Sequence, residues 1–399
     1  MPDALGVYPA RAEDILDLSI IGASSSIDSG VIVYTRANGD RYLVGKMGVK
    51  KLVRVGAFDI GYSDAIVPDW WLPFNKAPKI ALSGNPASGN SLTGVAWSPD
   101  GKYLAVANYT VSVSKKVGDT LITLALPGTA LTNQIECAWS PDGKYVAFVG
   151  GTSTCTVYKR SGDTFTAISV GTSGALNTVA WSPNGQYLAL GTTSSPYVYI
   201  YSQSGDTFTA TGTFDTPPTG AGYGVAWSPD STYLAIAHAT SPFVSVYKRT
   251  GTSFAKLTNP VNLPAGQGSY VHWSPDGNYL AVAHTTTPFI TVYKRSGDTL
   301  VKLDNPTVLP TGNAGEAFWS PDSQYLAVAH TTTPFLTIYK RVGDVLTKLP
   351  NPSQLPAGNG TCLSWSPDGQ ILAMGHATSP YLSFYKAASD VYGGIPVRI

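Results

Sequence analysis

The chain has 399 residues and a formal net charge of +1, and only 13% of its residues are charged, against about 25% in an average soluble domain. Nucleic-acid-binding proteins usually carry a basic excess or a cationic cluster. This sequence has neither, so we expect no DNA or RNA partner. Hydrophobic residues make up 43% of the chain, which is enough for a large core.

The cysteines and the start of the chain exclude further classes. Cys137, Cys155 and Cys362 are odd in number and show no Cys-x-x-Cys spacing, so we expect core thiols rather than disulfides or a zinc site. No apolar run approaches the roughly 18 residues of a membrane span. The first 14 residues lack the basic start and apolar stretch of a signal peptide. The sequence therefore predicts a protein that is made without export and has no membrane span.

Residues 1–74 differ in pattern from the rest of the chain and predict a small β-rich module. Ala12–Leu18 has the pattern of one short helix. Gly30–Arg36 and Arg41–Val44 flank an Asn-Gly pair, which is the strongest short-range signal of a β-hairpin. Lys50–Val55 follows as a third strand.

Two adjacent tryptophans, Trp70 and Trp71, lie in an aromatic stretch bounded by prolines at the end of this module. One interpretation is that they fill the seam between the module and the following domain. The other is that they anchor the chain in a groove of a partner, because tryptophan is enriched in the hot spots of interfaces. Burial of Trp70 in the isolated protein would argue against the anchor.

The remainder of the chain contains a seven-fold internal repeat. Each unit has a tryptophan followed by Ser-Pro-Asp or Ser-Pro-Asn, at spacings of 42, 42, 46, 46, 46 and 46 residues. The seven tryptophans are Trp97, Trp139, Trp181, Trp227, Trp273, Trp319 and Trp365. A period of about 40 to 50 residues is typical of propeller blades and of helical arrays.

The fifth unit decides between these two architectures. Tyr270–Trp273 is a short apolar strand, and Ser274–Gly277 has the Pro and Gly positions of a tight turn. Tyr279–His284, Phe289–Lys294 and Thr299–Leu303 alternate as three more strands, and nothing in the unit has a helical period. Each unit is therefore predicted to be a four-stranded antiparallel blade.

The repeat predicts an all-β fold in which residues 75–399 form a seven-bladed β-propeller. A sheet with two apolar faces is unstable alone, so neighbouring blades must cover it, and each repeated tryptophan is expected between adjacent sheets. The seventh unit needs a fourth strand to close the ring. Either Pro78–Ser83 or Asp390–Ile399 can supply it, and our interpretation favours the amino-terminal segment.

At these residues the chain resembles the WD-repeat family of β-propellers, as in Val95–Ala105, which looks like the family's stretch from first to second strand. The family's Gly-His pair is missing, its turn Asp is replaced by Thr285–Thr287, and its Trp-Asp pair reads Tyr293-Lys294. The resemblance therefore implies the fold and the role of a rigid binding platform. It implies neither the family's internal hydrogen-bond network nor a specific partner.

A second resemblance concerns bacteriophage proteins. Residues 281–289 and 327–335 are identical, and Ser/Thr/Gly-rich propellers of this style look like those of phage structural proteins. Residues 18–55 are similar to the β-rich attachment modules of phage tail-fibre and head-fibre proteins. This resemblance implies that the amino-terminal module docks the chain on a particle.

Four of the five histidines occupy one equivalent position, at the end of the second strand in blades four to seven. They are His238, His284, His330 and His376. Adjacent sheets lie about 10 Å apart, whereas ligands of one zinc ion lie within about 4 Å of each other, so we expect no metal site. We expect these rings to cap strand ends through a Thr hydroxyl or a carbonyl, and retain His284 and His330 as candidate ligand contacts.

Motifs of catalysis are missing from the sequence. It contains no Gly-x-Ser-x-Gly elbow, His-Glu-x-x-His helix or phosphate-binding Gly loop. Its acids lie mainly in the repeated turns, which spread them around one rim rather than pairing them for glycoside hydrolysis. We therefore expect no enzymatic activity and no cofactor.

The two rims of the predicted ring differ in charge. The Ser-Pro-Asp and Lys-Arg-Ser-Gly-Asp turns form a rim of mixed charge, and the Thr-Thr-Thr-Pro-Phe and Asn-Pro-x-x-Leu-Pro segments form a nearly uncharged one. Loops of the second kind suit contact with a glycan or another protein. Its candidate binding residues are Phe243, Phe289, Phe335 and Tyr381. The alternative is that these rings fill gaps between blades.

Together these patterns favour a non-enzymatic bacteriophage virion protein, a tail or head fibre, decoration protein or host-adhesion knob. Residues 1–74 would bind other virion proteins, and the propeller, present in several copies or as a homo-oligomer, would bind a host surface glycan or protein. The alternatives are an intracellular WD-repeat scaffold for protein complexes and a propeller glycosidase.

Overall fold

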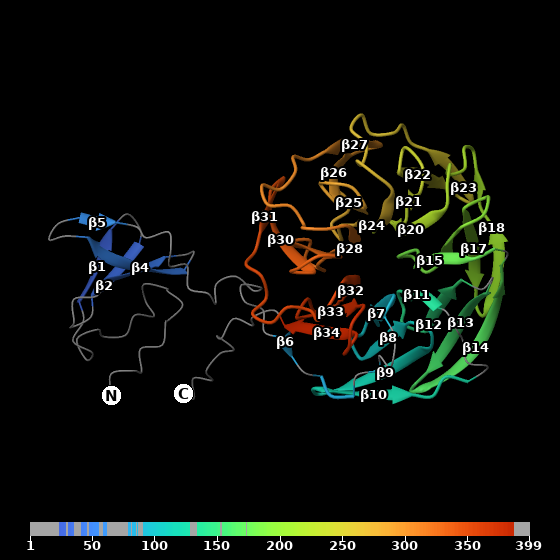
Figure 1. The fold of residues 1–399 in the computed structure, drawn as a ribbon, viewed down its shortest axis with the longest axis horizontal. Helices are drawn as coiled ribbons and strands as arrows, with labels where there is room; N and C mark the ends of the chain where they lie inside the picture. Colours follow the sequence, from blue (N-terminus) through green and yellow to red (C-terminus); the bar gives the residue numbers. More distant parts are fainter. Residues whose placement is uncertain are drawn as a thin grey trace. The chain divides into compact units, whose positions relative to one another are not determined.

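The structure, a computed structural model, describes residues 24–28, 31–35, 41–45, 48–55, 59–61, 79–80, 82–84, 86, 91–127, 134–151, 154–172 and 174–386. The chain divides into two compact units, Met1–Leu72 and Pro73–Ile399 (Figure 1). All regular secondary structure in the described residues is β-strand. In this part of the chain no helix is long and apolar enough to span a membrane.

The first unit contains an antiparallel five-stranded meander in the order β1-β2-β3-β4-β5. Its strands are β1 (Ser24–Asp28), β2 (Val31–Thr35), β3 (Arg41–Gly45), β4 (Gly48–Val55) and β5 (Asp59–Gly61). The expected hairpin is confirmed, because β2 pairs with β3. The predicted third strand lies within β4, whereas β1 and β5 were not predicted. The expected helix at Ala12–Leu18 lies outside the described residues.

The second unit contains seven sheets, and the predicted seven-bladed propeller is confirmed. Within each blade, strands that follow one another in the chain pair antiparallel, from the centre of the ring outward (Figure 1). Blades one to three consist of β7 (Gly94–Trp97), β8 (Tyr103–Ala107), β9 (Val111–Val117), β10 (Thr120–Leu124); β11 (Gln134–Trp139), β12 (Tyr145–Gly150), β13 (Thr154–Ser161), β14 (Thr164–Gly171); and β15 (Leu176–Trp181), β16 (Tyr187–Thr192), β17 (Val198–Ser204), β18 (Thr207–Thr211).

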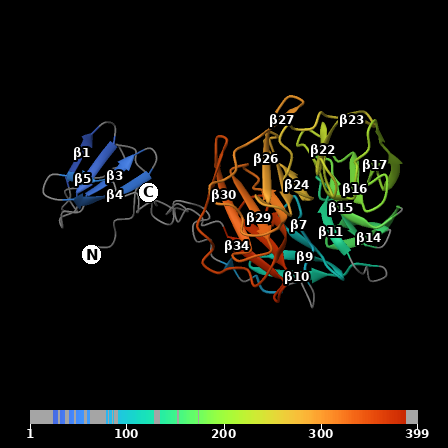
Figure 2. The same ribbon diagram turned by 45° about the horizontal axis from the view of Figure 1, so that its top comes forward.

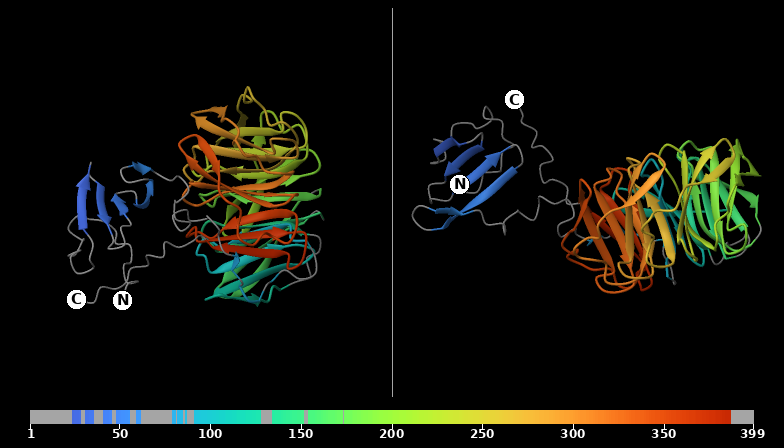
Figure 3. Two further views of the ribbon diagram at one scale, coloured as in Figure 1. Left: turned by 60° about the vertical axis from the view of Figure 1, so that its left-hand side comes forward. Right: turned by 90° about the horizontal axis from the view of Figure 1, so that it is seen from above.

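Blades four to six repeat this arrangement. They consist of β20 (Gly222–Trp227), β21 (Tyr233–His238), β22 (Val244–Thr250), β23 (Ser253–Lys256); β24 (Gly268–Trp273), β25 (Tyr279–His284), β26 (Ile290–Ser296), β27 (Thr299–Lys302); and β28 (Ala314–Trp319), β29 (Tyr325–His330), β30 (Leu336–Val342), β31 (Val345–Lys348). Blade four carries a fifth strand, β19 (Thr213–Phe214), which pairs parallel with β23 and was not predicted. Figures 2 and 3 show the blades side by side, with their strands running between the two rims.

The repeated tryptophans lie between adjacent blades, as expected. Their exposed fractions range from 1% to 8%. Trp319 of blade six packs on Tyr279 of blade five, with ring centroids 5.9 Å apart. The indole Nε1 of Trp181 donates a hydrogen bond to the carbonyl of Ala138 in the preceding blade, at 3.2 Å. Each tryptophan thus belongs to a core shared by two sheets.

The seventh blade takes its fourth strand from the amino-terminal side of the propeller. It consists of β32 (Gly360–Trp365), β33 (Ile371–His376), β34 (Leu382–Lys386) and β6 (Lys79–Ile80), and β6 pairs antiparallel with β34. Of the two closing segments considered, the amino-terminal one is therefore confirmed. The other, Asp390–Ile399, lies outside the described residues.

The chain after β6 extends this closure to blade one. Ser83 forms a parallel bridge with Thr120 of β10, and its carbonyl accepts a hydrogen bond from the backbone N–H of Leu121 at 2.8 Å. Leu82, which is 6% exposed, packs in one core cluster with Trp97 and with Phe384 of β34. One short segment therefore contacts both the first and the last blade.

Replacing Leu82 with Ala tests this closure. The substitution leaves a cavity where blades seven and one meet, and we expect the free energy of unfolding to fall by about 2 to 5 kcal/mol. Urea denaturation measures this change. The control is Val345→Ala at a 64% exposed position, with an expected change within about 0.5 kcal/mol. Equal effects of the two substitutions would contradict the role of this segment.

Candidate functional site

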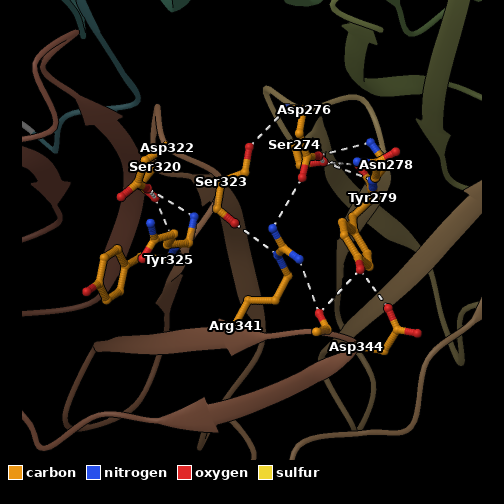
Figure 4. Close-up of polar contacts among 12 residues, drawn as sticks. Ser274, Asp276, Asn278, Tyr279, Ser320, Asp322, Ser323, Tyr325, Arg341 and Asp344 are labelled. Atoms are coloured by element: carbon orange, nitrogen blue, oxygen red, sulfur yellow. Dashed lines mark hydrogen bonds and ion pairs between the residues drawn. The ribbon is translucent and has the colours of Figure 1, made fainter. Parts of the chain in front are cut away.

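The repeated Ser-Pro-Asp turns are fastened by their own side chains (Figure 4). In blade five, the Ser274 hydroxyl donates to a carboxylate oxygen of Asp276. The same hydroxyl accepts the backbone N–H of Tyr279 at 2.9 Å, and Asp276 accepts that of Asn278 at 3.0 Å. The repeated aspartates thus accept hydrogen bonds that hold the turn. This structural role accounts for their recurrence, and no catalytic role is needed to explain it.

The same rim carries a polar contact between successive blades. The hydroxyl of Tyr279 in blade five donates to Oδ1 of Asp344 in blade six at 2.6 Å, and Lys294 Nζ lies 2.8 Å from Oδ2. Arg341 lies over the Tyr279 ring, 4.5 Å from its centroid (Figure 4). The hydrogen bond from Lys294 holds the pKa of Asp344 below its ordinary value.

Three other pairs of blades repeat this contact. The corresponding Tyr, Asp and Lys residues are Tyr103, Asp163 and Lys115; Tyr145, Asp206 and Lys159; and Tyr233, Asp298 and Lys248. Because the tyrosine beside each of these four Ser-Pro-Asp turns contacts the turn between the third and fourth strands of the next blade, both turn types lie on one rim, as the sequence predicts. We call it the charged rim. The Lys and Asp side chains of this rim are largely paired with one another.

The opposite rim, which we call the neutral rim, consists of the turns between second and third strands and the connections between blades. Thr311 in the connection to blade six donates a hydrogen bond to the carbonyl of Thr333 at 2.8 Å. Apolar side chains are exposed on this rim. They are Val261 at 98%, Tyr109 at 59%, Val308 at 52%, Leu355 at 37% and Leu263 at 36%.

The four predicted aromatic contacts also belong to the neutral rim. Each of them follows a proline and has a positive φ, from 65° to 69°. They are Phe243, Phe289, Phe335 and Tyr381. Each ring is half-buried. Phe289 and Tyr381 pack against core clusters, so these two rings help to fill the space between strands. Their part in binding stays a prediction.

The two histidines retained as ligand contacts are completely buried. The Nε2 atoms of His284 and His330 lie 3.0 Å from the hydroxyls of Thr291 and Thr337 on the adjacent strand. This is the threonine contact that the sequence suggested. Burial lowers the pKa of both rings to about 4, so they are neutral at pH 7. In this structure they present no accessible surface to a ligand on the rim.

The remaining predictions concern the cysteines, a metal site and the two adjacent tryptophans. Cys137, Cys155 and Cys362 are buried free thiols, as expected. In the part of the chain that the structure describes, no group of three or more His, Cys, Asp or Glu residues is placed to hold a metal ion. Trp70 and Trp71 lie outside the described residues, so both interpretations of these tryptophans stay open.

The sequence analysis did not single out the central channel. A cavity of about 430 Å³ is lined by the first strands of all seven blades, whose labels stand innermost in Figure 1. Apolar residues form most of its wall, and four of the repeated tryptophans, Trp97, Trp139, Trp181 and Trp227, are among them. Its larger polar residues include Glu136 on β11, Asn177 on β15, Tyr270 and His272 on β24, and Glu316 on β28.

Two carboxyl groups lie in this channel with hydrogen bonds but without a basic partner. Glu136 accepts the Tyr270 hydroxyl on one oxygen and the Val179 backbone N–H, at 3.2 Å, on the other. Glu316, which is 5% exposed, accepts the Leu363 backbone N–H at 2.7 Å. Burial raises the pKa of Glu136 to about 7 and that of Glu316 well above its ordinary value.

His272 lies on the same wall and is held in one orientation. Its Nδ1 accepts the backbone N–H of Trp319 at 3.3 Å, and its ring stacks on Phe318 with centroids 3.8 Å apart. Because Nδ1 accepts, the neutral ring carries its proton on Nε2. Burial lowers the pKa of His272 to about 3.

A signal for these residues was present in the sequence. One position before the repeated tryptophan, four blades have Ala, whereas blade five has His272 and blade six has Phe318. Three positions before it, two blades have Gly, whereas Glu136, Tyr270 and Glu316 interrupt the pattern. Large polar residues at positions that hold small residues elsewhere indicated the channel site.

Comparisons with known proteins agree with this fold. A family model described as "Lactonase, 7-bladed beta-propeller" matches residues 178–365, and one described as "WD domain, G-beta repeat" matches residues 78–114. No curated protein sequence matches the chain.

Many solved structures are similar to the chain. One is titled "Crystal Structure of Mitotic Checkpoint Complex"; the similar chain is 21% identical, with a TM-score of 0.62, and the match covers 84% of this chain and 99% of that chain. At this identity the similarity shows the fold alone.

The buried histidines predict how stability depends on pH. Their folded pKa of about 4 lies below the ordinary 6.5, so the unfolded chain binds protons that the folded chain does not. Stability should therefore fall as the pH decreases from about 6.5 to about 4. His284→Gln should reduce the protons taken up on unfolding near pH 5 by about one.

The measurement is the slope of the free energy of unfolding against pH, from denaturation series. Thr286→Ala, at a nearby exposed position, is the control and should leave the slope unchanged. If His284→Gln leaves the slope unchanged, this ring has the same pKa in the folded and the unfolded chain, and the prediction is wrong.

Proposed function

We propose that this chain is a non-enzymatic binding platform of the WD-repeat type, which recognises a protein partner through its neutral rim. The observation that carries the proposal is the exposure of Val261, Leu263, Val308 and Leu355 on this rim. Apolar side chains at the centre of an interface contribute most when they are removed from water on binding.

The arrangement of these side chains supports a single surface. Val261 and Leu263 lie in the connection from blade four to blade five, Val308 in the next connection and Leu355 in the one after it. Three consecutive connections thus expose apolar residues, with Leu263 and Leu355 at equivalent positions of the repeat and Val261 and Val308 at different ones. By contrast, the charged rim pairs most of its charges internally, as Lys294 and Asp344 do.

The matches to a WD domain and to a chain of a mitotic checkpoint complex support the same class of function. The name of the other matching family raises lactone hydrolysis as the alternative. Hydrolysis would need a positioned base and a reachable lactone carbonyl. Hydrolysis of a lactone by the wild-type chain, lost in Glu136→Gln, would contradict the non-enzymatic proposal.

Docking on a bacteriophage particle through residues 1–74 stays a prediction, and so does a location in the virion. Neither the matches reported above nor the described strands β1 to β5 add support to it. The same holds for binding of a host glycan and for assembly in several copies.

Charge placed on the neutral rim tests the proposal. In Val261→Asp/Val308→Asp two carboxylates enter the proposed interface, and we expect binding of the partner to weaken at least tenfold, because each buried charge lacks a pairing group. The measurement is affinity purification with the tagged full chain from its native cells, quantified by mass spectrometry.

The chain offers a matched control on the charged rim. Val342→Asp/Val345→Asp introduces the same charges at positions that are 68% and 64% exposed. It should retain the partner that Val261→Asp/Val308→Asp loses, with equal melting temperatures of the two variants. A partner that both variants retain, or that both lose, would contradict binding through the neutral rim.

A further inference from the structure

We propose that the central channel binds a small organic cation, an ammonium or guanidinium compound, at Glu136 and Glu316. This site goes beyond the proposed function, which concerns the neutral rim. The cavity of about 430 Å³ falls in the range of small-molecule sites, about 300 to 1,000 Å³.

The first argument is charge. Glu316 is 5% exposed and Glu136 is half-buried. Carboxyl groups are rarely buried unless they are paired, yet the residues that line the cavity include neither Lys nor Arg. Glu136 and Glu316 receive hydrogen bonds only from the Tyr270 hydroxyl, from Thr178 and from backbone N–H groups, as far as the described residues show. A cationic ligand would supply the missing opposite charge.

The other titratable groups of the wall do not supply it. These are Tyr223, Tyr270, His272, Cys137 and Cys362. Burial raises the pKa of Tyr270 and of both thiols and lowers that of His272, so each of these four is neutral at pH 7. None of these four groups therefore supplies a positive charge to the wall.

The second argument is the aromatic wall. Tyr223, Tyr270 and Phe318 line the same cavity as the carboxyl groups, and Phe318 is stacked on His272. Ring faces attract ammonium and guanidinium groups, most strongly where water is excluded. A wall that combines carboxyl groups with aromatic rings favours organic cations over neutral polar molecules.

The third argument is the pattern of the repeat itself. Blades five and six are identical in residues 281–289 and 327–335, in their second strands and the following turns. Their first strands differ: Tyr270 and His272 in one correspond to Glu316 and Phe318 in the other. The two blades therefore differ at both of these channel-lining positions, although their second strands are identical.

Binding of a cation must be linked to protons. Burial raises the pKa of Glu136 to about 7 and that of Glu316 well above its ordinary value, and a nearby cation stabilises the ionised form. A bound cation should therefore release protons, and its affinity should increase with pH. Below the pKa of one participating carboxyl, the increase is up to about tenfold for each pH unit.

Isothermal titration calorimetry of the full chain tests the site. The probes are n-butylammonium, 1,4-diaminobutane and methylguanidinium, with n-butanol as the neutral analogue. We expect one-to-one binding of at least one cation, weaker at pH 6 than at pH 8, and proton release that appears as a dependence of the heat on the buffer. Absence of binding by all three cations, or equal binding of n-butanol, would overturn the proposal.

Glu136→Gln/Glu316→Gln keeps the size of both side chains and removes their charge, and should weaken binding at least tenfold. Asp344→Asn removes a carboxylate from the charged rim and should leave binding unchanged. Unchanged affinity in the double variant would also overturn the proposal. If that variant does not fold, the proposal is tested by the wild-type chain alone: binding of a cation without proton release would overturn it. Val261→Asp/Val308→Asp should bind the cation normally, which separates this site from the proposed function.

Discussion

The burial of each blade against its neighbours is the interaction on which the whole structure depends. A four-stranded sheet with two apolar faces cannot be stable alone, and here the second strands are completely buried. Trp319 belongs to the core between blades five and six, where it contacts Tyr279. Since every blade needs two neighbours, the ring must close, and β6 closes it by pairing with β34.

The closed ring has three kinds of surface: the charged rim, the neutral rim and the central channel. The charged rim fastens blades to one another through contacts such as that of Asp344 with Tyr279 and Lys294. The neutral rim exposes apolar side chains, of which Val261 is the most accessible at 98%. The channel is enclosed by first strands, where low access to water raises the pKa of Glu136. The proposed recognition of a partner and the proposed binding of a small cation therefore belong to separate surfaces of one propeller.

Most of the fold could be predicted from the sequence because its determinants are local and repeated. The tryptophan, the Ser-Pro-Asp or Ser-Pro-Asn turn and the alternating strands recur seven times, and every recurrence predicts one more blade. The closing strand was harder, since β6 has two residues and pairs across the whole length of the propeller. The channel residues Glu136 and Glu316 were missed because they become neighbours only when the ring closes. The burial of His284 likewise depends on adjacent strands rather than on its own sequence context.

The most direct test of the shared core is hydrogen exchange in Trp319→Ala. The substitution removes the largest side chain between blades five and six and should lower the free energy of unfolding by about 3 to 5 kcal/mol. If the ring is one cooperative unit, the slowest amides of all seven second strands should exchange faster by the same factor. Faster exchange confined to blades five and six, with the other blades unchanged, would contradict the account.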